Sequence, residues 1–225
     1  MIALLAREVA GLGHVVAGVL SPLPAAASLL AQAMGPTRAT ILGSRRFNPF
    51  SEGGRELFDC AAEGRIDAFF LSGGQIDGQA NINLVGLGDP ARPSHRFPGS
   101  FGSAYLYFLV PRIVLFREEH SRRSLVPRVD FISAPGSSPD NVYRRGGPTV
   151  LVTGLARFSF ADRFRLESIH PGHDLAEIAS ATGFDFDSPA AASTTAPPSD
   201  EELRIIRGRV RDELAESYPR FAAGL

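Results

Sequence analysis

Residues 66–83 read IDAFFLSGGQIDGQANIN, an apolar run that changes abruptly into a loop rich in glycine and amide side chains. The run over residues 67–71 has the length and apolar content of a buried strand. Gly73 and Gly74 follow it at once, and glycines at such a point let the backbone turn sharply or approach another group closely. The stretch therefore predicts a strand of a buried sheet with a specialised loop at its tip.

The amide side chains of this loop allow two interpretations. Gln75, Asn81 and Asn83 both donate and accept hydrogen bonds, so they are suited to holding a ligand at the strand tip. Alternatively, Asp77 and Gly78 form a turn and the amides tie the loop to itself. The composition of the loop leaves both interpretations open.

Strands and helices alternate along the first third of the chain. Apolar periodicity predicts strands at residues 14–20, 37–42 and 67–71, and helices at residues 1–10, 25–34 and 55–63. This alternation predicts an α/β fold, an open and mostly parallel sheet with helices on both faces in a three-layer domain. Such sheets bind ligands at the carboxyl ends of their strands.

The remainder of the chain continues the domain and then changes character. We expect strands at residues 105–110, 113–116, 127–132 and 149–154, and a short helix at residues 174–181. Residues 188–199, SPAAASTTAPPS, have too little apolar surface to fold alone and are predicted to be a linker. Beyond them, Ser199 and Glu202 form a capping box for an amphipathic helix. The predicted organisation is a domain over residues 1–187, a linker over 188–199 and a C-terminal helical segment over 200–225.

Composition excludes several classes of function. The net charge of −1 gives no electrostatic reason to expect nucleic acid or an anionic membrane as a partner. All 23 basic residues are arginine, which excludes a Schiff-base lysine and a P-loop lysine. The single cysteine, Cys60, cannot form an internal disulfide, so we expect a buried inert thiol and a cytoplasmic protein.

Neither a membrane span nor a metal site is predicted. Residues 1–27 are apolar, but charges, glycines and prolines interrupt them, which argues against a transmembrane helix. His170 and His173 flank a Pro-Gly turn without helical spacing or a neighbouring carboxylate cluster, so no metal site is expected.

Two further segments are candidates for binding chemistry. In FPGSFGSAYLY, residues 97–107, the backbone N–H groups of Gly99, Ser100 and Gly102 could form an oxyanion-type site, or the segment is a plain turn. In LGSRRFNPFSEGG, residues 42–54, Arg45 and its neighbour could bind phosphate or carboxylate, or be solvated surface charges.

Taken in order, five segments resemble the β subunits of the glutaconate-type coenzyme A transferases. They are GHVVAGVLSPLPAAASLLA (13–31), FFLSGGQIDGQANIN (69–83), RFPGSFGSAYLY (96–107), VDFISAPG (129–136) and LESIHPGHDLAEIASATGFDFD (166–187). The resemblance covers nearly the whole chain up to residue 187. It implies an open α/β fold, a heteromeric assembly with an α subunit (α2β2), and an acyl-CoA thioester as substrate, with coenzyme A as part of the substrate rather than a permanently bound cofactor.

One position differs from the family pattern. The transferases attack the thioester with a β-subunit glutamate in the loop after the second strand, and Gly43 stands there in this sequence. Glycine carries no nucleophile, and the nearest carboxylate is Glu52, nine residues further on. This loss is similar to a subgroup of two-subunit hydrolases in bacterial steroid catabolism that open a cyclic β-keto acyl-CoA, with the essential glutamate on the α subunit.

The resemblance implies a hydrolase subunit acting in steroid (cholesterol) ring degradation. The residues it implies are Gly99, Ser100 and Gly102 for oxyanion-type contacts, and Ser44, Arg45, Gly73, Gly74, Gln75, Asn81 and Phe101 for contacts with the substrate. Two alternatives stay open: a true transferase that uses Glu52 or a partner carboxylate, and a non-catalytic subunit that stabilises its partner.

Overall fold

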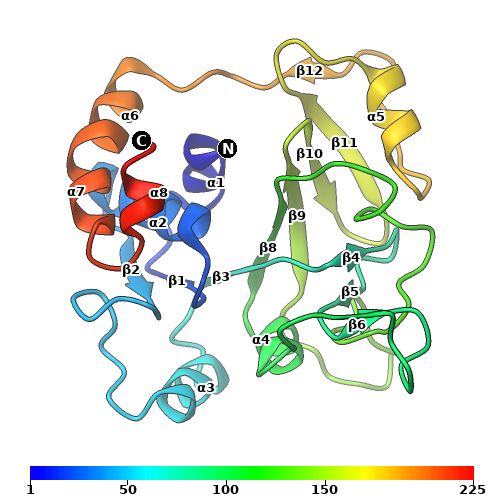
Figure 1. Ribbon diagram of the computed structural model, residues 1–225, viewed down its shortest axis with the longest axis horizontal. Helices are drawn as coiled ribbons and strands as arrows, with labels where there is room; N and C mark the ends of the chain where they lie inside the picture. Colours follow the sequence, from blue (N-terminus) through cyan, green and yellow to red (C-terminus); the bar gives the residue numbers. More distant parts are fainter. The chain divides into compact units, whose positions relative to one another are not determined.

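The structure is a computed structural model that describes residues 1–225 (Figure 1). The chain divides into two compact units, each with its own strands and helices. Unit 1 comprises Met1–Phe70 together with Pro197–Leu225, and unit 2 comprises Leu71–Ala196. None of the helices is both long enough and apolar enough to cross a lipid bilayer.

Unit 1 contains two parallel strands and all but the last residue of a third, in the order β2-β1-β3. Their bounds are His14–Ala17 for β1, Arg38–Ile41 for β2 and Ala68–Leu71 for β3. Every residue of β1 and β3 is buried, which explains why these strands read as uninterrupted apolar runs.

The helices of unit 1 come from both ends of the chain. They are α1 (Ile2–Val9), α2 (Pro22–Met34), α3 (Gly54–Ala62), α6 (Asp200–Ile205), α7 (Arg211–Leu214) and α8 (Pro219–Ala222), with a π-helical turn at Ile206–Val210. Helix α2 contacts α1, β1, β2 and α7, and the C-terminal helices lie beside it (Figure 1). The predicted capping box is present, since Ser199 and Glu202 exchange hydrogen bonds at the start of α6.

Unit 2 contains five strands in the order β8-β9-β10-β11-β12. Their bounds are Arg112–Arg117, Pro148–Thr153, Ala156–Phe160, Phe164–Ile169 and Ser193–Thr194. The pairs β8–β9 and β11–β12 are parallel, whereas β9–β10 and β10–β11 are antiparallel. Strand β12 lies in the segment predicted to be a linker, so part of that segment is paired with β11.

The rest of unit 2 consists of two helices and two short hairpins. The helices are α4 (Ser103–Leu109) and α5 (Leu175–Ala181), and the hairpin strands are β4 (Gln75–Ile76), β5 (Ile82–Asn83), β6 (Gly86–Leu87) and β7 (His95–Arg96). The loop after β3 thus becomes a β-hairpin of its own, β4 with β5.

The predicted fold class is confirmed, but several elements differ from the prediction. Most of the segment 105–110, predicted as a strand, belongs to helix α4, which ends at Leu109. Ser103, Leu106 and Tyr107 are the buried positions of the helix, and their spacing is helical although the aromatic residues favour a strand. The segment 127–132, also predicted as a strand, is irregular.

Strands β10 and β11 were not predicted. Polar residues alternate with apolar ones along them, Arg157 and Ser159 in β10 and Arg165 and Glu167 in β11, and the two strands form an antiparallel pair. Because polar residues interrupt both strands, neither shows the continuous apolar run that is typical of a strand buried on both faces.

Candidate active site

Gly73 and Gly74 are closely surrounded by the chain's own atoms. A β-carbon on Gly73 would lie 2.6 Å from the carbonyl oxygen of Gln75 and 3.2 Å from Cβ of Ile82, and one on Gly74 would overlap the ring of Phe97. At Gly73 the hairpin folds back closely on itself and leaves no room for a side chain, whereas at Gly74 the ring of Phe97 fills the space. Contact between these two glycines and a substrate stays a prediction.

The amide side chains of the loop point into the protein. Gln75, Asn81 and Asn83 are all buried. Asn83 Nδ2 donates to Gln75 Oε1 at 2.7 Å and to the Gly86 carbonyl at 2.7 Å. Asn81 Nδ2 donates to the carboxylate of Asp77 at 3.1 Å. These contacts are the ones expected of a loop tied to itself, the second of the two interpretations of the sequence.

The same hairpin is tied to residues 129–136. The N–H of Asp130 donates to Gln75 Oε1 at 2.9 Å, and the N–H of Gly136 donates to Asn81 Oδ1 at 3.0 Å. Asp77, which was singled out in the sequence only as part of a turn, accepts hydrogen bonds from both the side chain and the N–H of Asn81. A rigid polar hairpin results, with its backbone conformation fixed from several sides.

Residues 99–102 of the turn at residues 99–103 are exposed or partly exposed, and the backbone is strained at Phe101. Gly99 has φ +110° and Phe101 has φ +35°, a conformation that side-chain-bearing residues rarely adopt. Phe101 is 82% exposed. The N–H groups of Gly99, Ser100 and Gly102 donate to no acceptor within the chain, so they are free to meet an anionic oxygen.

Ser103 adds a group that sequence reasoning missed. It follows the turn as the first residue of α4, and its hydroxyl is buried without a hydrogen-bond partner. A buried hydroxyl left unpaired is unfavourable by about 1–3 kcal/mol. The only sequence signal for it is its place in the Gly/Ser-rich turn.

In unit 1, the loop at residues 43–46 is held by the C-terminal segment. Ser44 is buried, and its hydroxyl donates to Glu216 Oε2 at 2.7 Å while accepting from the N–H of Phe47 at 3.0 Å. The N–H of Arg45 donates to Glu216 Oε1 at 2.8 Å, and the side chain of Arg45 is exposed. Hydrogen bonds from the Ser217 hydroxyl, the Ser44 hydroxyl and the Arg45 N–H lower the pKa of Glu216.

Gly43 faces a tyrosine. A β-carbon at Gly43 would lie 3.0 Å from the hydroxyl oxygen of Tyr218. That hydroxyl also accepts a hydrogen bond from the N–H of Ser21 at 3.4 Å, and burial raises the pKa of Tyr218. Tyr218 thus contacts the segments that follow both β1 and β2. The space that a side chain at position 43 would first enter is occupied by this residue.

Glu52 lies away from these contacts, in the segment before α3. Its side chain is 63% exposed and pairs with Arg55 at 3.5 Å. Its N–H donates to Glu56 at 2.9 Å. Among the carboxylates of unit 1, Glu216 rather than Glu52 therefore contacts the loop at residues 43–46.

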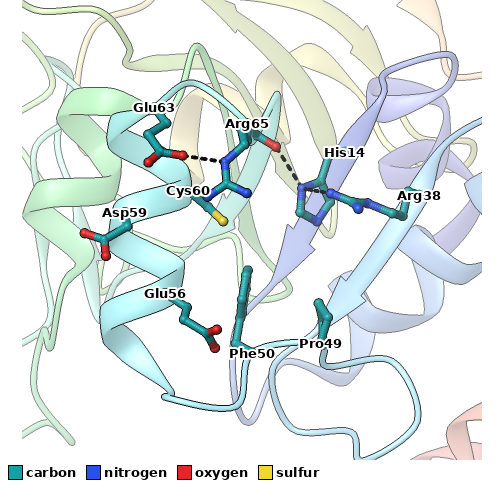
Figure 2. A pocket seen from close by; sticks show the side chains of 9 residues that line it. All are labelled: His14, Arg38, Pro49, Phe50, Glu56, Asp59, Cys60, Glu63 and Arg65. Carbon is teal, nitrogen blue, oxygen red and sulfur yellow. Dashed lines mark hydrogen bonds and ion pairs between the residues drawn. The ribbon is translucent and has the colours of Figure 1, made fainter.

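Two cavities lie elsewhere in the chain. In unit 1, a cavity of about 320 Å³ opens at the amino ends of β1 and β2, and Figure 2 shows His14 and Arg38 side by side in its wall. Burial lowers the pKa of His14, and the Arg65 carbonyl lies 2.8 Å from its Nδ1. In unit 2, a cavity of about 540 Å³ has Arg122 and Arg163 among its lining residues. Neither lining contains a residue predicted to contact substrate.

The two candidate regions, one in each unit, differ in the groups they offer. The turn at residues 99–103 offers unpaired N–H donors, which stabilise negative charge that develops on an oxygen. The loop at residues 43–46 is contacted by an ionised carboxylate, Glu216, that already accepts hydrogen bonds.

No group of three or more histidine, cysteine, aspartate or glutamate side chains is arranged to hold a metal ion.

Residues 13–181 match the family model described as "Coenzyme A transferase". The chain belongs to the coenzyme A transferase family. The predicted family is therefore confirmed, and its matched residues include the strand-tip hairpin, the turn at residues 99–103 and the loop at residues 43–46.

Two curated relatives of this chain carry different activities in their names. The chain is 28% identical over 153 residues to a 3-oxoadipate CoA-transferase subunit of Pseudomonas knackmussii, covering 64% of this chain and 58% of that protein. It is 32% identical over 160 residues to the cholesterol ring-cleaving hydrolase IpdB subunit of Rhodococcus jostii, covering 68% of this chain and 62% of that protein. The match thus spans about three fifths of the length of these relatives.

Three solved structures match almost the whole chain. The decarboxylase AibA/AibB matches with a TM-score of 0.81 and 28% identity, covering 100% of this chain and 95% of that one. Rhodococcus jostii IpdAB matches with a TM-score of 0.81 and 26% identity, covering 97% and 93%. Glutaconate coenzyme A-transferase of Acidaminococcus fermentans has a TM-score of 0.82 at 19% identity, covering 96% and 94%, and shows the shared fold.

Proposed function

We propose that this chain is the β subunit of a heteromeric acyl-CoA hydrolase that opens the ring of a cyclic β-keto acyl-CoA formed in steroid degradation. The observation that carries the proposal is Gly43. The position where transferases place their attacking glutamate has no side chain here, and the Tyr218 hydroxyl lies 3.0 Å from where its β-carbon would be. This arrangement supports chemistry in which the attacking group comes from elsewhere.

The proposed reaction is a hydrolytic retro-Claisen cleavage. Water, deprotonated by a general base, adds to the ring ketone, and the bond between that carbon and the α-carbon of the thioester breaks. The ketone carbon leaves as a carboxylate, and the electron pair remains as a thioester enolate that then takes up a proton. The enolate oxygen needs hydrogen-bond donors, and the N–H groups of Gly99, Ser100 and Gly102 are available for it.

A partner chain supplies the base in this proposal. IpdAB and AibA/AibB carry two-component names, which supports an α-type partner for this chain. The main catalytic glutamate is assigned to that partner, and an α2β2 assembly is expected. Coenzyme A enters only as part of the substrate.

The test uses the reconstituted pair and a cyclic β-keto acyl-CoA. We expect ring opening with uptake of one water molecule, and loss of turnover when the candidate glutamate of the partner is replaced by glutamine. After incubation with acyl-CoA and treatment with borohydride or hydroxylamine, intact-mass analysis should find this chain unmodified. Unchanged turnover after the glutamate replacement would defeat the assignment.

The transferase alternative is supported by two observations. The 3-oxoadipate CoA-transferase relative is 28% identical to this chain, and the carboxylate of Glu216 contacts the loop at residues 43–46. In a transferase, one carboxylate would attack the thioester and carry coenzyme A as a glutamyl thioester. The same trapping experiment discriminates, because a modified glutamate at Glu52 or Glu216 would establish the transferase.

A further inference from the structure

We propose that Glu216 and Tyr218 are positioning residues that hold the loop at residues 43–46 in its working conformation. This inference rests on the proposed function, in which that loop faces the acyl-CoA. It assigns a role in substrate positioning to a C-terminal segment far away in the sequence.

The first tie is the Glu216 carboxylate. Its two oxygens accept from two different parts of the loop, the Ser44 hydroxyl at 2.7 Å and the Arg45 N–H at 2.8 Å. The Ser44 hydroxyl in turn accepts from the N–H groups of Arg46 and Phe47. One carboxylate therefore organises three consecutive N–H groups, those of residues 45, 46 and 47, directly or through Ser44.

The second tie is Tyr218. Its hydroxyl lies against Gly43 and accepts from the N–H of Ser21 at 3.4 Å. Ser21 precedes α2 and follows β1, whereas Gly43 follows β2. Because β1 and β2 are parallel neighbours, the segments after their carboxyl ends lie at the same edge of the sheet, and Tyr218 joins both.

A second carboxylate, Glu213, reinforces the arrangement. Glu213 lies 3.8 Å from Arg46 Nη2 and accepts from Arg209 Nε at 3.1 Å, with only 10% of its side chain exposed. Its Oε2 is buried without a hydrogen-bond partner. Because Arg46 is exposed, this ion pair contributes less than the two hydrogen bonds that Glu216 accepts from Ser44 and Arg45.

These contacts make the loop depend on an acceptor that the loop itself lacks. In Glu216→Gln, one carboxylate oxygen becomes an amide NH2 group, which donates but cannot accept, so only one of the two donors, the Ser44 hydroxyl or the Arg45 N–H, keeps its acceptor. The loop should then populate other conformations. The matched control is Asp212→Asn, because Asp212 is exposed and pairs only with Arg211.

The experiment has two independent readouts on the full chain. Amide hydrogen exchange of residues 44–47 is measured first, and we expect it to be about tenfold faster in Glu216→Gln and faster in Tyr218→Phe, with Asp212→Asn unchanged. Steady-state turnover of the reconstituted pair is measured next. There kcat/KM should fall about tenfold in Glu216→Gln, mainly through kcat, and stay within about twofold in Asp212→Asn.

Each result has a defined meaning. Unchanged exchange in Glu216→Gln would show that Glu216 does not hold the loop at residues 43–46. Faster exchange with unchanged turnover would show that the loop does not position the substrate. If the unmodified pair does not open the ring but exchange of residues 44–47 is still faster in Glu216→Gln, the proposed function fails, while the role of Glu216 in holding the loop stands. Equal effects of Asp212→Asn and Glu216→Gln would reduce both to general surface-charge effects and overturn the inference.

Discussion

Gly74 shows how one missing side chain shapes the strand-tip hairpin, because the ring of Phe97 lies where its β-carbon would stand. We expect Gly74→Ala to lower the free energy of unfolding by about 1–3 kcal/mol, the usual effect of forcing extra atoms into a packed interior. Phe97→Leu in the same chain should recover part of that loss. Urea unfolding followed by circular dichroism measures both.

Gly208 is the matched control for this substitution. It lies in the π-helical turn with nothing near its would-be β-carbon, so Gly208→Ala should leave stability unchanged or raise it by up to about 1 kcal/mol. If both alanine variants lost the same stability, backbone freedom rather than the Phe97 ring would be the cause.

At the scale of elements, a partly buried ion pair joins the first helix to the sixth. Arg7 Nε donates to Glu202 Oε1 at 2.8 Å, and Glu202, only 4% exposed, also accepts from the N–H of Ser199 at 2.7 Å. Glu202→Gln should therefore lower the free energy of unfolding by about 2 kcal/mol, since Arg7 keeps its charge and loses its counterion. Glu201→Gln, an exposed carboxylate paired with Arg204, should change it by less than about 0.5 kcal/mol. Equal losses in the two variants would contradict this account.

At the same scale, His120 connects strand β9 with Thr182, the residue that ends helix α5. Its ring nitrogens lie 2.8 Å from the Thr153 hydroxyl and 2.9 Å from the Thr182 hydroxyl. Burial is the main cause that lowers the pKa of His120 to about 4. The charge of Glu177 raises this pKa by a smaller amount, and His170 and His173 lower it slightly. The folded protein thus favours the neutral ring.

The pH dependence follows from that direction. The unfolded chain takes up a proton at His120 below about pH 6.5, and the folded chain does so only near pH 4. The contribution of His120 to the free energy of unfolding is therefore fully present above about pH 6.5 and is lost as the pH drops toward 4. The loss is limited to about 2 kcal/mol because the ring keeps some contact with solvent. His120→Gln should flatten the stability profile between these pH values, as measured by urea unfolding at several pH values. An unchanged slope would refute the assignment.

For the whole molecule, the proposed function requires a partner chain. We expect this chain alone to show no measurable ring opening, because it lacks a carboxylate at position 43 and the assigned base lies on the partner. Titration with the α-type partner should raise turnover until the two chains are equimolar, and sedimentation should show the matching complex. Full turnover by the isolated chain would refute the proposal.

The sequence predicts the strands of unit 1 well and the contacts of the candidate site poorly. Strands β1 and β3 are buried on both faces, so an apolar run is enough to find them. Helix α4 was mistaken for a strand because aromatic residues outweighed its helical burial pattern. The hydrogen bond between Ser44 and Glu216 spans 172 residues, and no local pattern can indicate it.

The tight packing around Gly73 and Gly74 also affects how substitution data on this family are interpreted. A survey of all single substitutions would score both positions as intolerant, with the severity expected of ligand contacts. That intolerance would arise even if no thioester ever touched them, because the hairpin crowds Gly73 and the ring of Phe97 crowds Gly74. Substitution maps must therefore be paired with ligand footprinting before such glycines are counted as part of a binding surface.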